Sequence, residues 1–350
     1  MIILKDNRKL LVIFAVSILI IPLIVFVLIS GLKKEDESTP TSSTINNRPV
    51  DKIIKGKKYI SPYTGEEITQ EAYDNLPVMA IIENSDDARP QSGLKSADIV
   101  YETMAEGGIP RFIALFQKNN SDKIGPIRSA RPYFIDISKE YNLPFAHCGG
   151  SGDALVKIKN ENLMSLNEIS YTSTYWRDKE RKAPHNLYTS TEKLRSLVKS
   201  KGYITASNPK LNFDKNYWDN NNLPPANEIL LKINRYYNTS YSFKGGIYHK
   251  YMNSEPAVNK EDTDQLAFKN IVVQFTSIKL QNDGSHLDIA LVGEGNGYVI
   301  SNGKYVKMKW YKTDVNSQTI LQDESGKLIP LNPGNTWWNI VDTSTTVDIK

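Results

Sequence analysis

The stretch PFAHCGGSGDAL (residues 144–155) decides the first half of the fold. It has the composition of a buried strand, a glycine turn and a helix start in immediate succession. The glycines allow a sharp turn, and Ser151 or Asp153 can cap the helix that follows. A strand that passes directly into a helix predicts a sheet covered by helices.

The same stretch raises two chemical alternatives. Cys148 could be a nucleophile with His147 as its base, but adjacent side chains of a strand point to opposite faces. The run of glycines could surround a phosphate, but it lacks the lysine and the spacing of a nucleotide-binding loop. These observations favour a tight turn with a capped helix and a small, buried cysteine.

Further strands and helices alternate on both sides of this corner. Apolar runs predict strands, and apolar residues on one face predict helices. The predicted strands are at 77–83, 97–108 and 111–117, and the predicted helices are at 128–143, 152–163 and 190–203. Thr189 and Glu192 have the spacing of a capping box before the last helix.

Beyond residue 225 the pattern changes to short strands separated by glycine turns. Hairpin turns are predicted at Gly245-Gly246 and Asn302-Gly303. Such spacing predicts a small antiparallel sheet. If Trp337 and Trp338 lie on a strand, one ring points inward and the other outward.

The N-terminal part predicts attachment to a membrane. Residues 10–32 carry no charge, and 23 residues of helix are long enough to span a bilayer. We expect a transmembrane signal anchor there, a cytoplasmic N-terminus at 1–9 and a flexible linker at 33–60. This arrangement predicts a single-pass protein of the bacterial cell membrane whose C-terminal ectodomain lies outside. No cysteine follows the apolar run, which excludes a lipid-modified cysteine there.

Charge and cysteine content exclude several classes of protein. Residues 1–60 carry ten Lys and Arg against five Asp and Glu, so the rest of the chain is close to neutral. A nucleic-acid partner is therefore not expected, because its binder would carry the basic excess on the folded part. One cysteine excludes an intramolecular disulfide framework. No motif predicts a cofactor or a metal site.

Several ordered motifs resemble the YerB family of bacterial "putative lipoproteins". They include KIGPIRSARPYFIDIS, AHCGGS, WRDKERKAPHNLYTSTEKL, LVGEGNGYVISNGKYVKMKW and IPLNPGNTWWNIV. The resemblance covers about residues 61–343 and implies two modules of unknown function on the outer face of a bacterial membrane. It implies no established reaction. Family members often begin with a lipid-anchored cysteine, which this sequence replaces with an apolar segment.

The predicted fold class is therefore α+β. A mixed sheet with helices forms the first module, an antiparallel β-rich module follows, and one transmembrane helix precedes both. The predicted boundaries are 61–205 for the first module, 206–225 for a connection rich in Asn and Pro, and 226–343 for the second module.

Arginines in the first module predict a cleft for an anion. A guanidinium group presents a fork of donors suited to carboxylate or phosphate. The expected ligand is an anionic component of the cell envelope or a protein partner. The alternative is a network of internal Arg–Glu pairs. The candidate binding residues are Arg111, Arg128, Arg131, Arg177, Glu102 and Asn186.

A hydrolase is the second hypothesis. His185 would be the base, Ser151 the nucleophile or water-positioning group, and His147 a further candidate. No serine-hydrolase elbow, zinc-protease motif or paired-carboxylate signature is present. The sequence therefore favours a binding protein over an enzyme.

Overall fold

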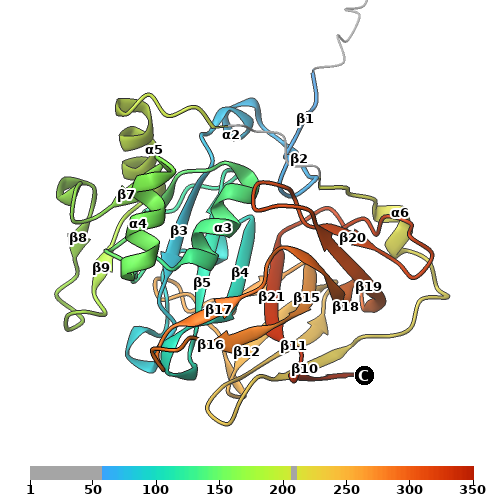
Figure 1. Cartoon of the computed structure of the whole chain (residues 1–350). Coiled ribbons are helices and arrows are strands. Elements are labelled where there is room, and N and C mark those ends of the chain that lie inside the picture. Colours follow the sequence, from blue (N-terminus) through green and yellow to red (C-terminus); the bar gives the residue numbers. More distant parts are fainter. Residues whose placement is uncertain (1–56, 206–210) are drawn as a thin grey trace, which may run out of the picture. The chain divides into compact units, whose positions relative to one another are not determined.

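The computed structural model describes residues 57–205 and 211–350, and Lys57–Lys350 forms one compact unit. Helices are few and short in the described residues (Figure 1). The α-helices are α2 (Gln70–Asp74), α3 (Pro132–Tyr141), α4 (Gly152–Asn160), α5 (Thr191–Ser200) and α6 (Lys215–Trp218). Single 3-10 turns lie at Asp86–Ala88, Leu94–Ser96, Glu106–Gly108 and Thr172–Thr174.

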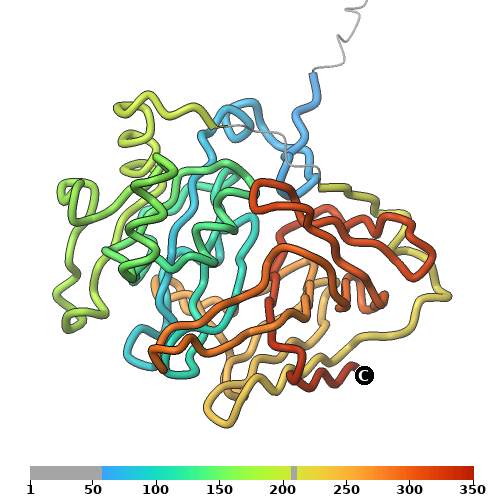
Figure 2. The backbone as a smooth tube through the Cα atoms, viewed as in Figure 1, coloured from blue at the N-terminus to red at the C-terminus, as the bar shows by residue number. Residues whose placement is uncertain are grey.

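A ten-stranded mixed sheet runs through the unit. Its strands, in spatial order, are β20 (Ile320–Gln322), β19 (Lys304–Lys312), β18 (Gly293–Ser301), β15 (Asn270–Thr276), β21 (Thr336–Asp342), β4 (Ile99–Met104), β5 (Pro110–Phe116), β3 (Val78–Ile82), β6 (Phe145–His147) and β7 (Ser165–Asn167). Strand β21 is parallel to both of its neighbours, β15 and β4. Figure 2 shows this red strand beside the blue-green β4.

A second sheet has six strands, all paired antiparallel. It contains β13 (Glu255–Pro256), β12 (Ile247–Met252), β11 (Asn238–Lys244), β10 (Glu228–Lys232) and β22 (Thr346–Ile349), with β14 (Ala267–Phe268) paired to β12. Three two-stranded sheets complete the set: β1 (Tyr59–Ile60) with β2 (Glu67–Ile68), β8 (Trp176–Arg177) with β9 (Leu187–Tyr188), and β16 (Ile278–Leu280) with β17 (Leu287–Ile289).

The predicted turns and the predicted corner are confirmed. Gly245-Gly246 joins β11 to β12, and Asn302-Gly303 joins β18 to β19. The stretch at 144–155 forms β6, a glycine turn and α4, and the chain then returns as β7, parallel to β6. The cap of α5 differs from the prediction, because Ser190 rather than Thr189 is the N-cap and accepts from the backbone of Lys193.

Both faces of the ten-stranded sheet are buried. All five residues of β3 are enclosed, and they divide by alternation between two separate hydrophobic clusters. Trp337 belongs to one cluster and Trp338 to the other, and both are at most 1% exposed. The expectation that one of the two rings points outward to solvent is therefore wrong, because β21 lies at the centre of a sheet that is covered on both sides.

The predicted fold class needs correction. The described residues are mostly β, and the second module is not one antiparallel sheet. Six of its strands form an antiparallel sheet of their own, whereas β15 and β21 are parallel and join, with β18, β19 and β20, the sheet of the first module. The longest helices, α3 and α5, have ten residues. Within 57–205 and 211–350, no helix has the length and apolar character needed to cross a bilayer. The span expected at 10–32 lies outside the described residues.

A buried ion pair connects the two large sheets. Lys250 of β12 donates to Glu102 of β4 at 2.9 Å, and neither side chain is more than 1% exposed. Tyr237 and Trp337 also donate to the Glu102 carboxylate, at 2.6 and 2.7 Å. Burial lowers the pKa of Lys250 to about 8, although Glu102 acts to raise it.

Candidate functional site

Three parallel strands end at the same edge of the large sheet. Glu83 follows β3, Cys148 follows β6 and Glu168 follows β7. The carboxyl ends of parallel strands are where open α/β sheets place ligands. This edge also receives side chains from the loop around β8 and β9, so we take it as the candidate site.

Glu83 is the central acid of this edge. Its side chain is 5% exposed, and its Oε1 accepts from Ser85 Oγ at 2.9 Å and lies 3.0 Å from His185 Nδ1. Arg128 Nε lies 3.2 Å from the same oxygen. Glu83 Oε2 is buried and has no hydrogen-bond partner among the described residues. One carboxylate oxygen therefore holds a serine, a histidine and an arginine in place.

Arg128 retains unused donors. Its side chain is 27% exposed, and its Nε faces Glu83. Its two terminal nitrogens have no partner in the part of the chain that the structure describes. The ion pair of Nε with Glu83 holds the guanidinium group at this edge and leaves these donors open to a ligand.

Arg177 is the second arginine of this edge and is exposed. It donates through Nη1 to Asn186 Oδ1 at 2.9 Å. Asn186 is itself buried and donates to the carbonyl oxygens of Asp178 and Arg181 at 3.0 and 3.2 Å. Asn186 therefore positions Arg177 from a rigid loop.

Cys148 lies close to both arginines. Burial and the hydrogen bond to Glu168 raise the pKa of the Cys148 thiol, while Arg177 and Arg128 act to lower it. A thiol with a raised pKa is a poor nucleophile at neutral pH. His147 does not contact Cys148, since its partners are Gly149 and Ser165. The sequence predicts a small, buried cysteine, and the structure shows one that is only partly buried.

Arg111 and Arg131 form a separate cluster around Glu106. Arg131 holds both carboxylate oxygens of Glu106, and Arg111 Nη2 lies 2.9 Å from Oε2. These three side chains are 12–17% exposed. Burial acts to raise the pKa of Glu106, but the bonds and charges of the two arginines lower it overall. Arg111, Arg131 and Glu106 therefore form an internal Arg–Glu network, which the sequence offered as the alternative to an anion-binding cleft.

Glu102 occupies a different place from the candidate arginines. Its carboxylate is enclosed with Lys250, Tyr237 and Trp337, and none of its hydrogen-bond partners in the described residues is an arginine. Its contacts serve the packing of the two sheets.

Ser151 and His185 have different partners. Ser151 Oγ donates to Asp153 Oδ1, whereas His185 Nδ1 faces Glu83 and Nε2 lies 3.8 Å from Asp87. Ser151 N donates to Ala130 O, and Gly149 N donates to the Asn167 side chain. These two backbone amides are therefore engaged within the protein.

Ser165 is the serine that the structure brings to His147, and no motif in the sequence pointed to it. Its Oγ lies 2.7 Å from His147 Nε2, and His147 Nδ1 lies 2.7 Å from Gly149 O. A carbonyl oxygen only accepts, so Nδ1 carries the proton and Nε2 accepts from Ser165. Burial lowers the pKa of His147 to about 4. Such a weak base is poorly matched to neutral pH.

No metal site is evident in the described ranges. Within 57–205 and 211–350 there is no group of three or more His, Cys, Asp or Glu side chains arranged to hold an ion. The open guanidinium donors of Arg128 and Arg177 are the groups of this edge whose chemistry suits an anion.

Comparisons with known proteins place the chain among proteins of unknown function. Residues 63–204 match the family "Protein of unknown function (DUF3048) N-terminal domain", and residues 229–338 match its C-terminal domain. "Putative lipoprotein YerB" of Bacillus subtilis is 32% identical over 297 residues, which are 81% of this chain and 87% of that protein. The crystal structure of the Bacillus subtilis YerB protein matches with a TM-score of 0.75 at 29% identity, over 83% of this chain and 100% of that one.

Proposed function

This chain belongs to the YerB family of DUF3048 proteins, and we propose that it acts outside the cytoplasm, at the bacterial membrane, by binding an anionic ligand. The location is supported by the relative from Bacillus subtilis, whose printed name is "Putative lipoprotein YerB". The N-terminal residues 1–56 lie outside the described structure, and the proposal does not depend on them.

The observation that carries the binding proposal is the state of Arg128. Its Nε is fixed by the buried Glu83, and its terminal nitrogens have no partner in the described residues. Arg177 lies on the same edge, held by Asn186. Two positioned guanidinium groups with open donors suit a carboxylate or a phosphate. Arg111 and Arg131 take no part, because Glu106 occupies them.

The hydrolase hypothesis has weaker support. His185 is oriented by Glu83 as a catalytic base would be, but the neighbour of its Nε2 is the carboxylate of Asp87. Nucleophilic catalysis needs a hydroxyl or thiol at that nitrogen. Ser85 approaches Nδ1 instead, at 3.4 Å, and already donates to Glu83.

Calorimetric titration of the full chain tests the binding proposal. The probes are a glycerol phosphate oligomer and an oligoglutamate, which separate phosphate from carboxylate recognition. We expect Arg128→Ala to weaken binding of the preferred probe by about tenfold or more, since charge-assisted hydrogen bonds are lost. Arg177→Ala should have a smaller effect because that side chain is more exposed.

Arg235→Ala is the matched control. Arg235 is exposed and lies over the ring of Tyr236 at 4.5 Å, and no contact among the described residues joins its side chain to Glu83, Arg128 or Arg177. Equal losses in Arg128→Ala and Arg235→Ala would mean that only net charge matters, and the proposal would be wrong. Thermal unfolding of each variant confirms that the fold is intact.

A further inference from the structure

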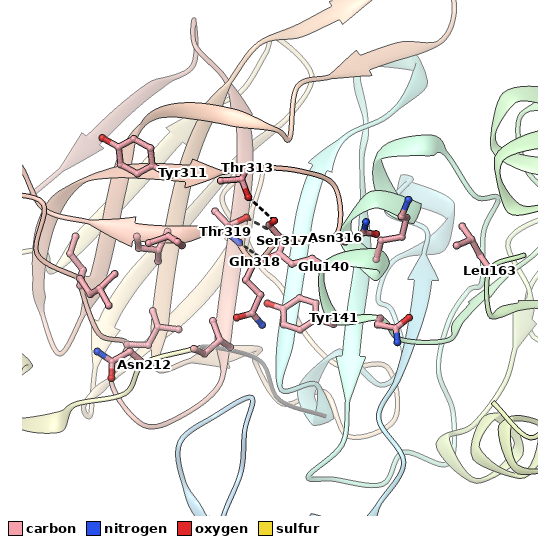
Figure 3. A pocket seen from close by; sticks show the side chains of 18 residues that line it. Glu140, Tyr141, Leu163, Asn212, Tyr311, Thr313, Asn316, Ser317, Gln318 and Thr319 are labelled. Carbon is pink, nitrogen blue, oxygen red and sulfur yellow. Dashed lines mark hydrogen bonds between the residues drawn. The ribbon is translucent and has the colours of Figure 1, made fainter. Parts of the chain in front are cut away.

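A cavity of about 830 Å³ lies between α3 and the strands β19 and β20 (Figure 3). The chain just before α6 contributes its remaining wall, with Leu211 and Asn212. Small-molecule sites are typically about 300–1,000 Å³. The cavity shares no lining residue with the arginine edge, so it is independent of the proposed function.

The floor of this cavity is aliphatic. Its buried aliphatic residues are Leu321, Ile329 and Leu331, each at most 7% exposed, and the buried Tyr141 lies in the same lining. At the mouth, Ile320 and Leu328 are 43% and 49% exposed. Large exposed aliphatic side chains around a concave surface indicate a site that an apolar group covers.

The residues that line the rim are polar. Asn142, Asn212 and Asn316 are exposed, and their side-chain amides have no partner among the described residues. Thr313 and Ser317 also line the rim; their hydroxyl groups are 2.7 Å apart, a hydrogen bond that Figure 3 marks, and both donate to the exposed carboxylate of Asp314. Each amide offers two donors and an acceptor, so the rim can bond to hydroxyl or amide groups of a ligand.

The charged residues of the lining are already neutralised. Glu140 is 2.7 Å from Lys312 and accepts from the backbone and hydroxyl of Thr319 at 2.8 and 3.1 Å. Lys139 pairs with Glu161. An anionic ligand group would therefore lose its water here without gaining a counter-charge. The cavity favours a neutral ligand over an anionic one.

We infer that this cavity binds a neutral amphiphile, with its aliphatic chain against Leu321, Ile329 and Leu331 and its uncharged polar end against the asparagine rim. The ligand class follows from the aliphatic floor, the open amides and the paired charges. No covalent step is involved.

Equilibrium dialysis of the full chain with n-octyl glucoside, below its micelle concentration, tests the inference. We expect saturable binding to one site. Glucose lacks the chain and should not bind. Octyl sulfate should bind at least about tenfold more weakly, because it would bring an unpaired negative charge to the rim beside Asp314. Absence of saturable octyl glucoside binding, or equal binding of octyl sulfate, would overturn the inference.

Variants at the mouth locate the site. Leu328→Asp places a charge at a half-exposed position, where it should weaken octyl glucoside binding by about tenfold or more with little effect on folding. Leu280→Asp is the control, because Leu280 is 61% exposed and does not line the cavity. An equal effect of both changes would refute the assignment to this cavity. Binding of the anionic probes by the arginine edge should be unchanged in both variants.

Discussion

His147 shows how one buried side chain can make stability depend on pH. It is fully enclosed at the end of β6, stacks on Phe145 and donates to Gly149 O. Burial holds its pKa at about 4, against an ordinary value of 6.5. The unfolded chain therefore takes up a proton between pH 6.5 and 4, whereas the folded chain does not until the pH falls to about 4.

We expect acidification through this window to destabilise the protein. The imidazole contributes a loss of about 3 kcal/mol in the free energy of unfolding between pH 6.5 and 4. His147→Gln has no titrating group at this position. The difference in the free energy of unfolding between wild type and this variant should therefore change by about 3 kcal/mol between pH 6.5 and 4. Chemical denaturation at several pH values measures both proteins. Parallel pH profiles would contradict the prediction.

Asp98 makes the comparison with a variant necessary. Burial raises its pKa to about 6, against the bonds from the Gln117 and Lys118 amides. Its contribution has the opposite sign, because between pH 3.8 and 6 the carboxyl of the unfolded chain ionises while the buried one keeps its proton, so folding becomes less favourable as the pH rises. It is present in wild type and in His147→Gln alike and cancels in their difference.

Contacts between residues far apart in the sequence explain where predictions for single residues fail. The alternation rule is obeyed by Trp337 and Trp338, which do point to opposite faces. The sequence could not show that both faces are covered, because that depends on segments far away in the chain. The pairing of Arg131 with Glu106, 25 residues apart, is equally invisible to local spacing.

At the scale of elements, local patterns were reliable. The corner at 144–155, the proline at the start of α3 and the two glycine hairpins depend on residues close in sequence. Spacing and alternation disfavour the phosphate-loop and thiol alternatives for the corner, and this interpretation stays a prediction. The edge formed by Glu83, Cys148 and Glu168 required the order of the strands, which spacing does not contain.

The pairing of β15 with β18 provides a prediction at this scale. A Cβ at Gly297 would lie 2.0 Å from the backbone oxygen of Val273 and 2.5 Å from Met308. We expect Gly297→Ala to cost about 2 kcal/mol or more, because the strands would have to separate. Denaturant unfolding of the full chain measures the change.

Gly152→Ala is the corresponding control. Gly152 begins α4, and an added Cβ there meets nothing within 4 Å. Alanine has a higher helix propensity, so stability should stay within about 1 kcal/mol of wild type. If Gly297→Ala proves as mild as this control, the close approach of β18 to β15 is not as described.

For the molecule as a whole, the two family segments share one sheet. The sequence predicted an antiparallel second module because its hairpins are local and easily recognised. The pairing of strand β21 has no such local signal, since its partners β15 and β4 begin 66 and 237 residues earlier in the chain. The matched family segments, 63–204 and 229–338, are therefore joined by backbone hydrogen bonds as well as by side chains.

The buried Glu102–Lys250 pair tests how strongly the sheets depend on each other. Lys250→Met removes the cation and leaves the enclosed carboxylate with Tyr237 and Trp337. We expect a loss of about 3–5 kcal/mol in the free energy of unfolding. Adding Glu102→Gln should recover part of it, and a double-mutant cycle gives the coupling.

An exposed pair serves as the reference. Lys58 and Glu67 are 2.6 Å apart with side chains 71% and 57% exposed, and Lys58→Met should cost less than about 1 kcal/mol. A loss of similar size in Lys250→Met would show that the buried pair does not hold the sheets together.

Because β21 lies at the centre of the large sheet but near the end of the chain, the sheet is completed late. A chain made or exported from its N-terminus delivers Thr336 and the residues after it last. Until then β4 and β15 are open strand edges, each apolar and ready to pair with another molecule. A product interrupted before Thr336 would hold nearly all of the sequence and still be prone to aggregate. The large sheet is therefore completed in one late step, in which β21 pairs with β4 and β15.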